Sequence, residues 1–534
     1  MRIAVILILV VAIPQDPATP EGDPERLQKM VAAVNVEDTP SLLFPGEGFA
    51  NLPATALPVL KDQQKRKDLR WPARACIAKA IRSIEERQQG LGWATEYEAR
   101  RSEFKRLLSG EYRRVSRRSP AWDRQALDAV EGCAGYWGSQ QYRRPEDAKR
   151  VLELAKVAIA EGCDDPLVLY ISARMLQDTR LRSPMEILEA HEAAANALDA
   201  SAYHPLLRAH SLKTLAQQLQ MKAGEKPTAE ARKEILDHLK ESVRLFSEAL
   251  ETDPKLTREF VLEQFEEILN LWAFYDDREK AFKPIHAAAH KAQPESPLAD
   301  LLMGSFEIHH AWDARGGGWA SEVGPEAWEK FKLRLQAARK ALETAWEKDP
   351  TSVLPSSLMM PVTMGDGSPR EEMEKWFERG VQAFPDKYAL YEAKLYYLEP
   401  KWHGSSEEML RFGRQCALAG NWSGSIPWIL QAAHRELAHY TAAGWQQNED
   451  MSYYARPEVW ADLRDLYSHY LRVYPNDAYA RASFAYFCGY ARHLKEADEQ
   501  FRVIGDSPTS LGLFGSRAQF DQARRAAAAA AREF

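Results

Sequence analysis

A four-residue pattern that recurs along the chain constrains its fold more than any other feature. In its full form a small residue is followed after four positions by a bulkier apolar residue, after three more by a second small residue, and after five more by proline. Spacings of four and three place side chains on one face of a helix, and the proline ends that helix. The four copies are Ala338, Leu342, Ala345 and Pro350; Ser242, Phe246, Ala249 and Pro254; Met373, Phe377, Gly380 and Pro385, which fits at three positions; and Ala193, Ala197, Ala200 and Pro205, in which the middle residue is small.

Helix pairs that stack on one another account for this pattern. A helix–turn–helix unit of about 34 residues needs small residues where its two helices cross and a proline after the second helix. Phe484, Ala485 and Cys488, followed by Ala497 and Phe501, match the two helices of a further unit. The gaps between the closing prolines are irregular. The sequence therefore predicts an all-α fold, a degenerate tetratricopeptide-like helix–turn–helix repeat array, or α-solenoid.

Helix starts are frequent, which supports the same fold. Serine caps the free N–H groups of a first helical turn, and a glutamate three residues later completes a capping box. Three pairs have this spacing, namely Ser183 with Glu186, Ser368 with Glu371, and Ser405 with Glu408. Alternating runs of Val, Ile and Thr, which are typical of strands, are scarce.

One part of the chain is similar to a known family. The strings HHAWDARGGGWA (309–320), AARKALETAWEKDP (337–350), EEMEKWFERGVQAFPDKY (371–388) and AKLYYLEPKWHGSSEEMLRFGRQC (393–416) resemble an uncharacterised bacterial family with tetratricopeptide-like helices. The resemblance covers about residues 300–430. It implies a helical-repeat fold and no particular activity.

The distribution of charge bears on the partners. Residues 61–118 hold 17 Lys/Arg against 8 Asp/Glu, whereas the whole chain has a net charge of −7. Such a block binds an anionic surface, nucleic acid or an acidic face of its own chain. Trp71, Ile77, Ile81 and Ile84 recur within it at helical spacing, so we interpret the block as solvated helix faces. We expect no strong nucleic-acid signal.

The N-terminus resembles an export signal. Arg2 precedes the apolar run Ile3–Ile13, which is too short to span a bilayer. We expect an exported or periplasmic protein without a transmembrane span, with a cytoplasmic location as the alternative. The segments predicted are a signal peptide at 1–18, a proline-rich segment at 19–60, a basic helical region at 61–140, a helical-repeat region at 141–300, a tetratricopeptide-like domain at 301–505 and a C-terminal helix at 506–534.

Two strings between predicted helices hold the residues that we expect to bind a partner. In the first string, residues 309–319, three glycines mark a loop or a close backbone approach, and charged and aromatic side chains lie beside them in the sequence. A helix end turned by glycine, with the tryptophans packed in the core, is the alternative interpretation. In the second string, residues 399–404, a lysine and a histidine flank a tryptophan. A rigid turn between helices is the alternative interpretation of this string. The predicted binding residues are Trp312, Asp313, Arg315, Trp319, Lys401, Trp402 and His403.

Metal and cofactor sites are not indicated. His286 and His290 lie four residues apart, a spacing that can hold a metal, but no third ligand is evident and packing is the better interpretation. None of the five cysteines forms a CxxC pair. Sequence patterns of known catalytic sites are not found.

The function predicted is a non-catalytic scaffold that binds a protein or peptide partner on a concave surface. The alternative is an enzyme or a small-ligand-binding protein with its site at the two strings. A third possibility is a polyanion-binding protein that uses residues 61–118.

Overall fold

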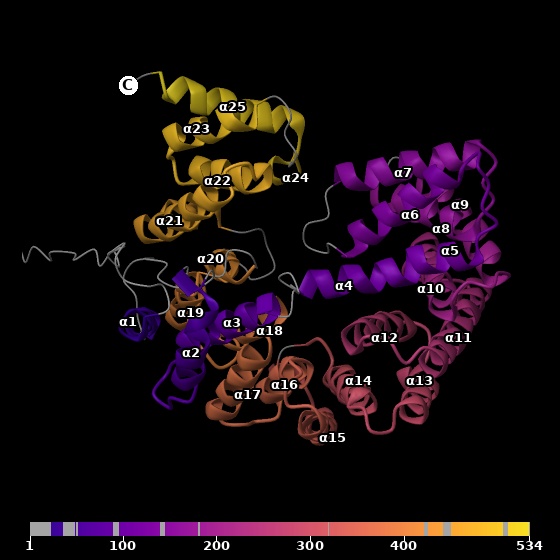
Figure 1. Cartoon of the computed structure of the whole chain (residues 1–534), viewed down its shortest axis with the longest axis horizontal. Coiled ribbons are helices and arrows are strands. Elements are labelled where there is room, and N and C mark those ends of the chain that lie inside the picture. Colours follow the sequence, from indigo (N-terminus) through magenta and orange to yellow (C-terminus); the bar gives the residue numbers. More distant parts are fainter. Residues whose placement is uncertain are drawn as a thin grey trace, which may run out of the picture. The chain divides into compact units, whose positions relative to one another are not determined.

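The computed structural model describes residues 23–35, 48–49, 52–88, 96–138, 145–179, 182–318, 320–420, 425–441, 450–505 and 511–532. Within these ranges every regular element is a helix, which confirms the all-α, tetratricopeptide-like class (Figure 1). The predicted signal peptide at 1–18 lies outside the described residues. None of the described helices is both long enough and apolar enough to cross a bilayer.

The helices form two compact units. The central unit comprises residues 94–368, and the terminal unit combines residues 1–93 with residues 369–534. The segment boundaries predicted above remain a prediction. The central unit contains α4 (Glu96–Lys105), a π-helical turn (Arg106–Gly110), α5 (Glu111–Val115), α6 (Asp123–Gly138), α7 (Pro145–Ala160), α8 (Pro166–Thr179), α9 (Pro184–Asp199), α10 (Pro205–Ala223), α11 (Ala229–Thr252), α12 (Arg258–Trp272), α13 (Arg278–Ala292), α14 (Leu298–Arg315), α15 (Pro325–Lys348) and α16 (Leu354–Gly365).

The terminal unit joins segments that are far apart in the sequence. Helix α3 packs against α17 and α19, because Trp71 at its start inserts among the rings of Phe377, Tyr391 and Phe412. The indole N–H of Trp71 donates to Gln415 Oε1 at 3.0 Å. The helices of this unit are α1 (Pro24–Val34), α2 (Leu57–Gln64), α3 (Trp71–Gln88), α17 (Arg370–Ala383), α18 (Tyr388–Tyr397), α19 (Ser406–Leu418), α20 (Ile429–Thr441), α21 (Pro457–Val473), α22 (Ala478–Tyr490), α23 (Leu494–Ile504), α24 (Leu511–Phe514) and α25 (Arg517–Ala530).

Three of the four patterns are buried faces of helices. Ala338, Leu342 and Ala345 of α15 are fully buried against α14, and the helix ends two residues before Pro350. Full burial of a leucine side chain stabilises a fold by about 1.5–3 kcal/mol. The patterns that begin at Ser242 on α11 and Met373 on α17 are buried in the same way.

The fourth pattern and two of the three capping boxes differ from the prediction. Ala193 and Ala200 are exposed, because α9 buries a different face that includes Leu188 and Leu198. The capping box of Ser183 forms as predicted. The box at Ser368 does not form, because Pro369 occupies the cap of α17 and the Ser368 hydroxyl accepts a hydrogen bond from Arg339. At Ser405 the hydroxyl accepts from the Glu408 N–H, but the Glu408 carboxylate pairs with Arg370 and does not complete the box.

Candidate binding site

The first string ends a helix and closes on itself. Helix α14 stops at Arg315, and Gly316 adopts a φ of +75°, which favours glycine. The Arg315 guanidinium lies over the Trp312 ring at 5.5 Å and the Trp328 ring at 5.3 Å, and it donates to the carbonyls of Gly316 and Gly318. This geometry agrees with a helix end turned by glycine. Trp319 lies outside the described residues.

Asp313 is directed to another helix. Its carboxylate accepts hydrogen bonds from Arg278 Nε at 2.6 Å and from Arg278 Nη2 at 3.2 Å. Arg278 begins α13 and also donates to the Leu269 carbonyl at 2.8 Å and to Asn270 Oδ1 at 3.2 Å. One guanidinium, 11% exposed, therefore ties the C-terminal ends of α12 and α14 to the start of α13.

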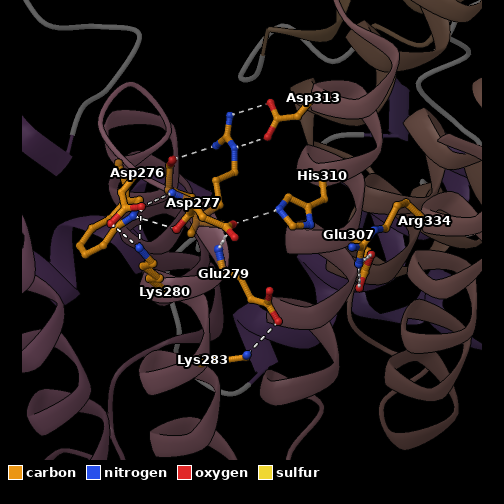
Figure 2. A network of polar contacts seen from close by, with 12 residues as sticks. Asp276, Asp277, Glu279, Lys280, Lys283, Glu307, His310, Asp313 and Arg334 are labelled. Carbon is orange, nitrogen blue, oxygen red and sulfur yellow. Dashed lines mark hydrogen bonds and ion pairs between the residues drawn. The ribbon is translucent and has the colours of Figure 1, made fainter. Parts of the chain in front are cut away.

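A pocket of about 460 Å³ opens beside this arginine. It lies where the C-terminal ends of α12 and α14 meet the N-terminal parts of α13 and α15. Figure 2 shows Asp313 and His310 of α14 facing the Asp276–Asp277 turn, with Arg334 of α15 on the other side. The lining residues are Ala273, Asp276, Asp277, Arg278, His310, Asp313, Ala314, Lys330 and Arg334.

The charges around this pocket neutralise one another. His310 Nε2 lies 3.6 Å from Asp277 Oδ1, and Lys280 Nζ lies 2.8 Å from Asp276 Oδ1. Asp277 also caps α13, because its side chain accepts from the Glu279 N–H. Arg334 pairs with Glu307 at 3.1 Å and Lys330 with Glu326 at 2.7 Å. The walls thus present both signs of charge, held in fixed directions by neighbouring helices.

The second string is a tight turn of the terminal unit. Lys401 Nζ lies 2.7 Å from the buried carboxylate of Glu399, which also accepts from Tyr440 at 2.8 Å. The Trp402 ring packs edge-on against Tyr396, and the exposed His403 stacks on Tyr397.

The turn at 399–404 requires a glycine at position 404 because no space is left there for a side chain. A Cβ at Gly404 would lie 2.2 Å from the backbone oxygen of Leu398. The arrangement agrees with the alternative of a rigid turn between helices. A binding role for Lys401, Trp402 and His403 stays a prediction.

The seven predicted residues are not brought together. Asp313 lines the pocket of the central unit, whereas Lys401, Trp402 and His403 belong to the terminal unit. Sequence reasoning missed most of the pocket lining, including Arg278, Lys330 and Arg334. The only signal was the run Asp276–Asp277–Arg278 at a helix start, which reads equally well as an ordinary cap.

Several cations of the basic block, residues 61–118, pair with acidic side chains on other elements. The pairs are Arg74–Glu378, Lys79–Asp386, Arg100–Glu263, Arg106–Asp253, Arg113–Glu131 and Arg118–Asp123. The interpretation of the block as solvated helix faces stays a prediction.

Of the two histidines on α13, His286 is half-buried and His290 is exposed. The His286 ring lies 5.0 Å from the Phe282 ring, and burial lowers the pKa of His286. In the part of the chain that the structure describes, no group of three His, Cys, Asp or Glu side chains is arranged to hold a metal ion.

Comparison with known proteins gives a likeness of fold. No family model matches the chain and no curated protein matches it, so the resemblance of residues 300–430 to an uncharacterised family gains no support. Solved structures of human IFIT1 do match. One, a dimer with PPP-AAAA, has 13% identity and a TM-score of 0.31 and covers 90% of this chain and 94% of that chain. A second, with m7Gppp-AAAA, has 13% identity and a TM-score of 0.32 over 93% and 96%.

These structures correct one expectation. The prediction of no strong nucleic-acid signal is wrong, because the matching solved structures are complexes with triphosphate or capped RNA. At this identity and TM-score the likeness carries no conclusion about this chain, and RNA binding is not transferred to it. RNA is therefore a partner that every binding experiment below includes.

Proposed function

We propose that the chain is a non-catalytic helical-repeat scaffold that binds a peptide segment of a protein partner at the α12–α15 pocket. The observation that carries this proposal is the convergence of Asp313, Arg278, His310 and Lys330 from α13, α14 and α15 on one opening of about 460 Å³. The central unit, to which the pocket belongs, offers stacked helices beside it, and stacked helices are what repeat arrays use to hold extended partners.

Exposed apolar side chains beside the pocket support a peptide. Phe274 lies in the turn after α12 and is 67% exposed, and Leu333 on α15 is 58% exposed. Leu333 follows Lys330 by three positions, so the two side chains are neighbours on the surface of α15. Apolar and aromatic anchors beside charged groups are the usual composition of a binding hot spot.

The balance of charge favours a peptide over a polyanion. Three aspartates line the pocket, namely Asp276, Asp277 and Asp313, and they match its three Lys/Arg side chains in number. A continuous phosphate backbone would meet these carboxylates, whereas a peptide presents amide groups and side chains of both signs to a wall of this kind.

Selection of peptides by the full chain tests the proposal. Peptides enriched from a random displayed library would be synthesised, and their Kd measured by fluorescence anisotropy. Lys330→Glu reverses one charge of the pocket. Its ion pair is exposed (62% and 81%), so its loss costs at most about 1 kcal/mol. We expect Kd to rise at least about tenfold, which corresponds to about 1.4 kcal/mol.

Lys332→Glu is the matched control, because Lys332 is exposed on the same helix and does not line the pocket. It should leave Kd unchanged. The same affinity in the folded Lys330→Glu variant would refute the site. Triphosphate oligoadenylate and a panel of small polar ligands are measured in parallel. Steeply salt-dependent RNA binding, lost in Lys330→Glu alone, would overturn the peptide proposal, and a small ligand that alone depends on Lys330 would favour the small-ligand or enzyme alternative.

A further inference from the structure

The terminal unit contains a second groove, of about 270 Å³, between α21, α22 and α23. Each helix contributes residues spaced by three or four positions, so each presents one face. The buried side chains of Leu471 and Phe484 form its apolar floor. The remaining lining residues are Arg464, Ser468, Arg472, Arg481, Glu496, Glu499 and Gln500.

The groove has a basic side and an acidic side. The three arginines belong to α21 and α22, and Glu496 and Glu499 belong to α23. Arg472 makes its hydrogen bond to His469, and Arg481 donates to Gln500 Oε1 at 2.7 Å and to the Pro475 carbonyl at 2.8 Å. Both arginines are thus held by groups other than carboxylates.

Arg464 of this groove pairs with Asp465 at 2.9 Å, whereas three other charged side chains of the groove lack a partner of the opposite charge in the part of the chain that the structure describes. Among the described residues, neither Arg472 nor Arg481 pairs with a carboxylate, and Glu499 pairs with no cation. Glu496 lies 3.5 Å from His493, outside the groove. In the α12–α15 pocket nearly all charged side chains are paired with the opposite charge. Within the described ranges, Arg472, Arg481 and Glu499 of this groove are not.

We propose that this groove binds a peptide segment that carries one carboxylate and one cationic side chain. The carboxylate accepts from Arg472 and Arg481, and the cation approaches Glu499. Val503, 58% exposed and one turn beyond Glu499 on α23, extends the apolar surface for a neighbouring side chain of the peptide. A polyanion such as RNA fits less well, because Glu496 and Glu499 form the facing side.

Four synthetic peptides test the inference with the full chain. Each is acetylated, amidated and flanked by leucines, and its two central positions carry Glu and Lys, Glu and Gln, Gln and Lys, or Gln and Gln, separated by a varied number of glycines. We expect the Glu–Lys peptide to bind at least about tenfold more tightly than the Gln–Gln peptide, since charge-assisted hydrogen bonds contribute about 1.5–3 kcal/mol each.

Variants of the protein test which side of the groove binds the peptide's carboxylate and which binds its cation. Arg472→Gln should remove the preference for Glu and retain the preference for Lys, and Glu499→Gln should do the reverse. Arg525→Gln on α25 and Glu458→Gln on α21 are matched controls, because both residues are exposed and outside the groove.

Equal binding of the four peptides would overturn the inference, and so would an unchanged preference in folded Arg472→Gln and Glu499→Gln variants. Tighter binding of oligoadenylate that is lost in Arg472→Gln would contradict it as well. Because these residues belong to another unit than Lys330, failure here and failure of the α12–α15 site are distinguishable.

Discussion

Gly304 of α14 lies directly against Leu342 of α15. A Cβ built on Gly304 would stand 2.5 Å from Leu342 Cδ2 and 2.7 Å from its Cγ. Leu342 is fully buried, and protein interiors are close-packed. The glycine therefore sets the distance between two helices that flank the α12–α15 pocket, and it supplies the small residue that a helix crossing requires.

Replacing this glycine should loosen the crossing. Gly304→Ala is expected to lower the free energy of unfolding by about 1–3 kcal/mol, the usual cost of overpacking a tight core. Urea denaturation followed by circular dichroism measures it. Gly135→Ala on α6 is the matched control, because a Cβ there meets nothing within 4 Å and should stabilise the helix by about 0.5–1 kcal/mol. Equal effects of the two substitutions would contradict the packing argument.

Lys394 is a buried charge held by one carboxylate. Its Nζ lies 2.6 Å from Glu374 Oε2 and 4.1 Å over the Phe377 ring, and its side chain is 4% exposed. Burial lowers the pKa of this lysine. Glu374→Gln should cost about 3 kcal/mol, because it leaves a buried cation without its partner, whereas Lys394→Met should change stability by less than about 1 kcal/mol.

The control for this pair is Glu372→Gln on the same helix, whose partner Lys375 is 50% exposed. That substitution should cost less than about 1 kcal/mol in the same urea titration. A larger loss for Lys394→Met than for Glu374→Gln would show that the ammonium group itself stabilises the unit.

The turn at 399–404 should respond to its glycine more than to its histidine. Gly404→Ala places a Cβ against the Leu398 backbone, which cannot yield as a side-chain end can, so we expect a loss of at least about 2 kcal/mol in unfolding free energy. His403→Ala should change stability by less than about 1 kcal/mol, since His403 is exposed. A tolerated Gly404→Ala would mean that the turn is less rigid than its contacts indicate.

The sequence predicted which face of a helix is buried better than it predicted which residues that face contacts. Spacing alone identifies Leu342 and Phe246 as buried, and both are. A bulky apolar residue between two small ones on a helix face marks the face that packs against the neighbouring helix. The pattern at Ala193 failed, since alanine fits buried and exposed positions alike and carries little information about which face is inside.

The candidate site depended on contacts that spacing does not encode. Asp313 was identified within its string, but its partner Arg278 is 35 residues away and belongs to another helix. The box at Ser368 failed for a related reason, because the guanidinium of Arg339, 29 residues away, takes the hydroxyl that would have capped α17. Long-range partners of this kind follow from how the helices stack, which one sequence does not give.

His191 gives the central unit a predictable response to acid. Its ring is 1% exposed on α9, and neither ring nitrogen has a hydrogen-bond partner among the described residues. Burial, followed by the nearby charge of Arg174, lowers the pKa of His191 to about 3. The folded protein therefore keeps this ring neutral over a pH range in which the unfolded chain, with an ordinary pKa near 6.5, binds a proton.

The sign follows from this difference. Between about pH 6.5 and pH 3 the unfolded state binds more protons, so the free energy of unfolding falls as the pH falls, by up to about 1.4 kcal/mol per pH unit for this one group. His191→Leu removes the group and should flatten that slope in urea titrations at a series of pH values. It should also stabilise the unit at pH 7, because an unsatisfied polar ring is replaced by an apolar side chain. His210 and His309, whose pKa values burial also lowers, remain in both proteins and contribute to the slope that is left. Identical slopes for the two proteins would show that His191 is hydrated or charged in the folded state.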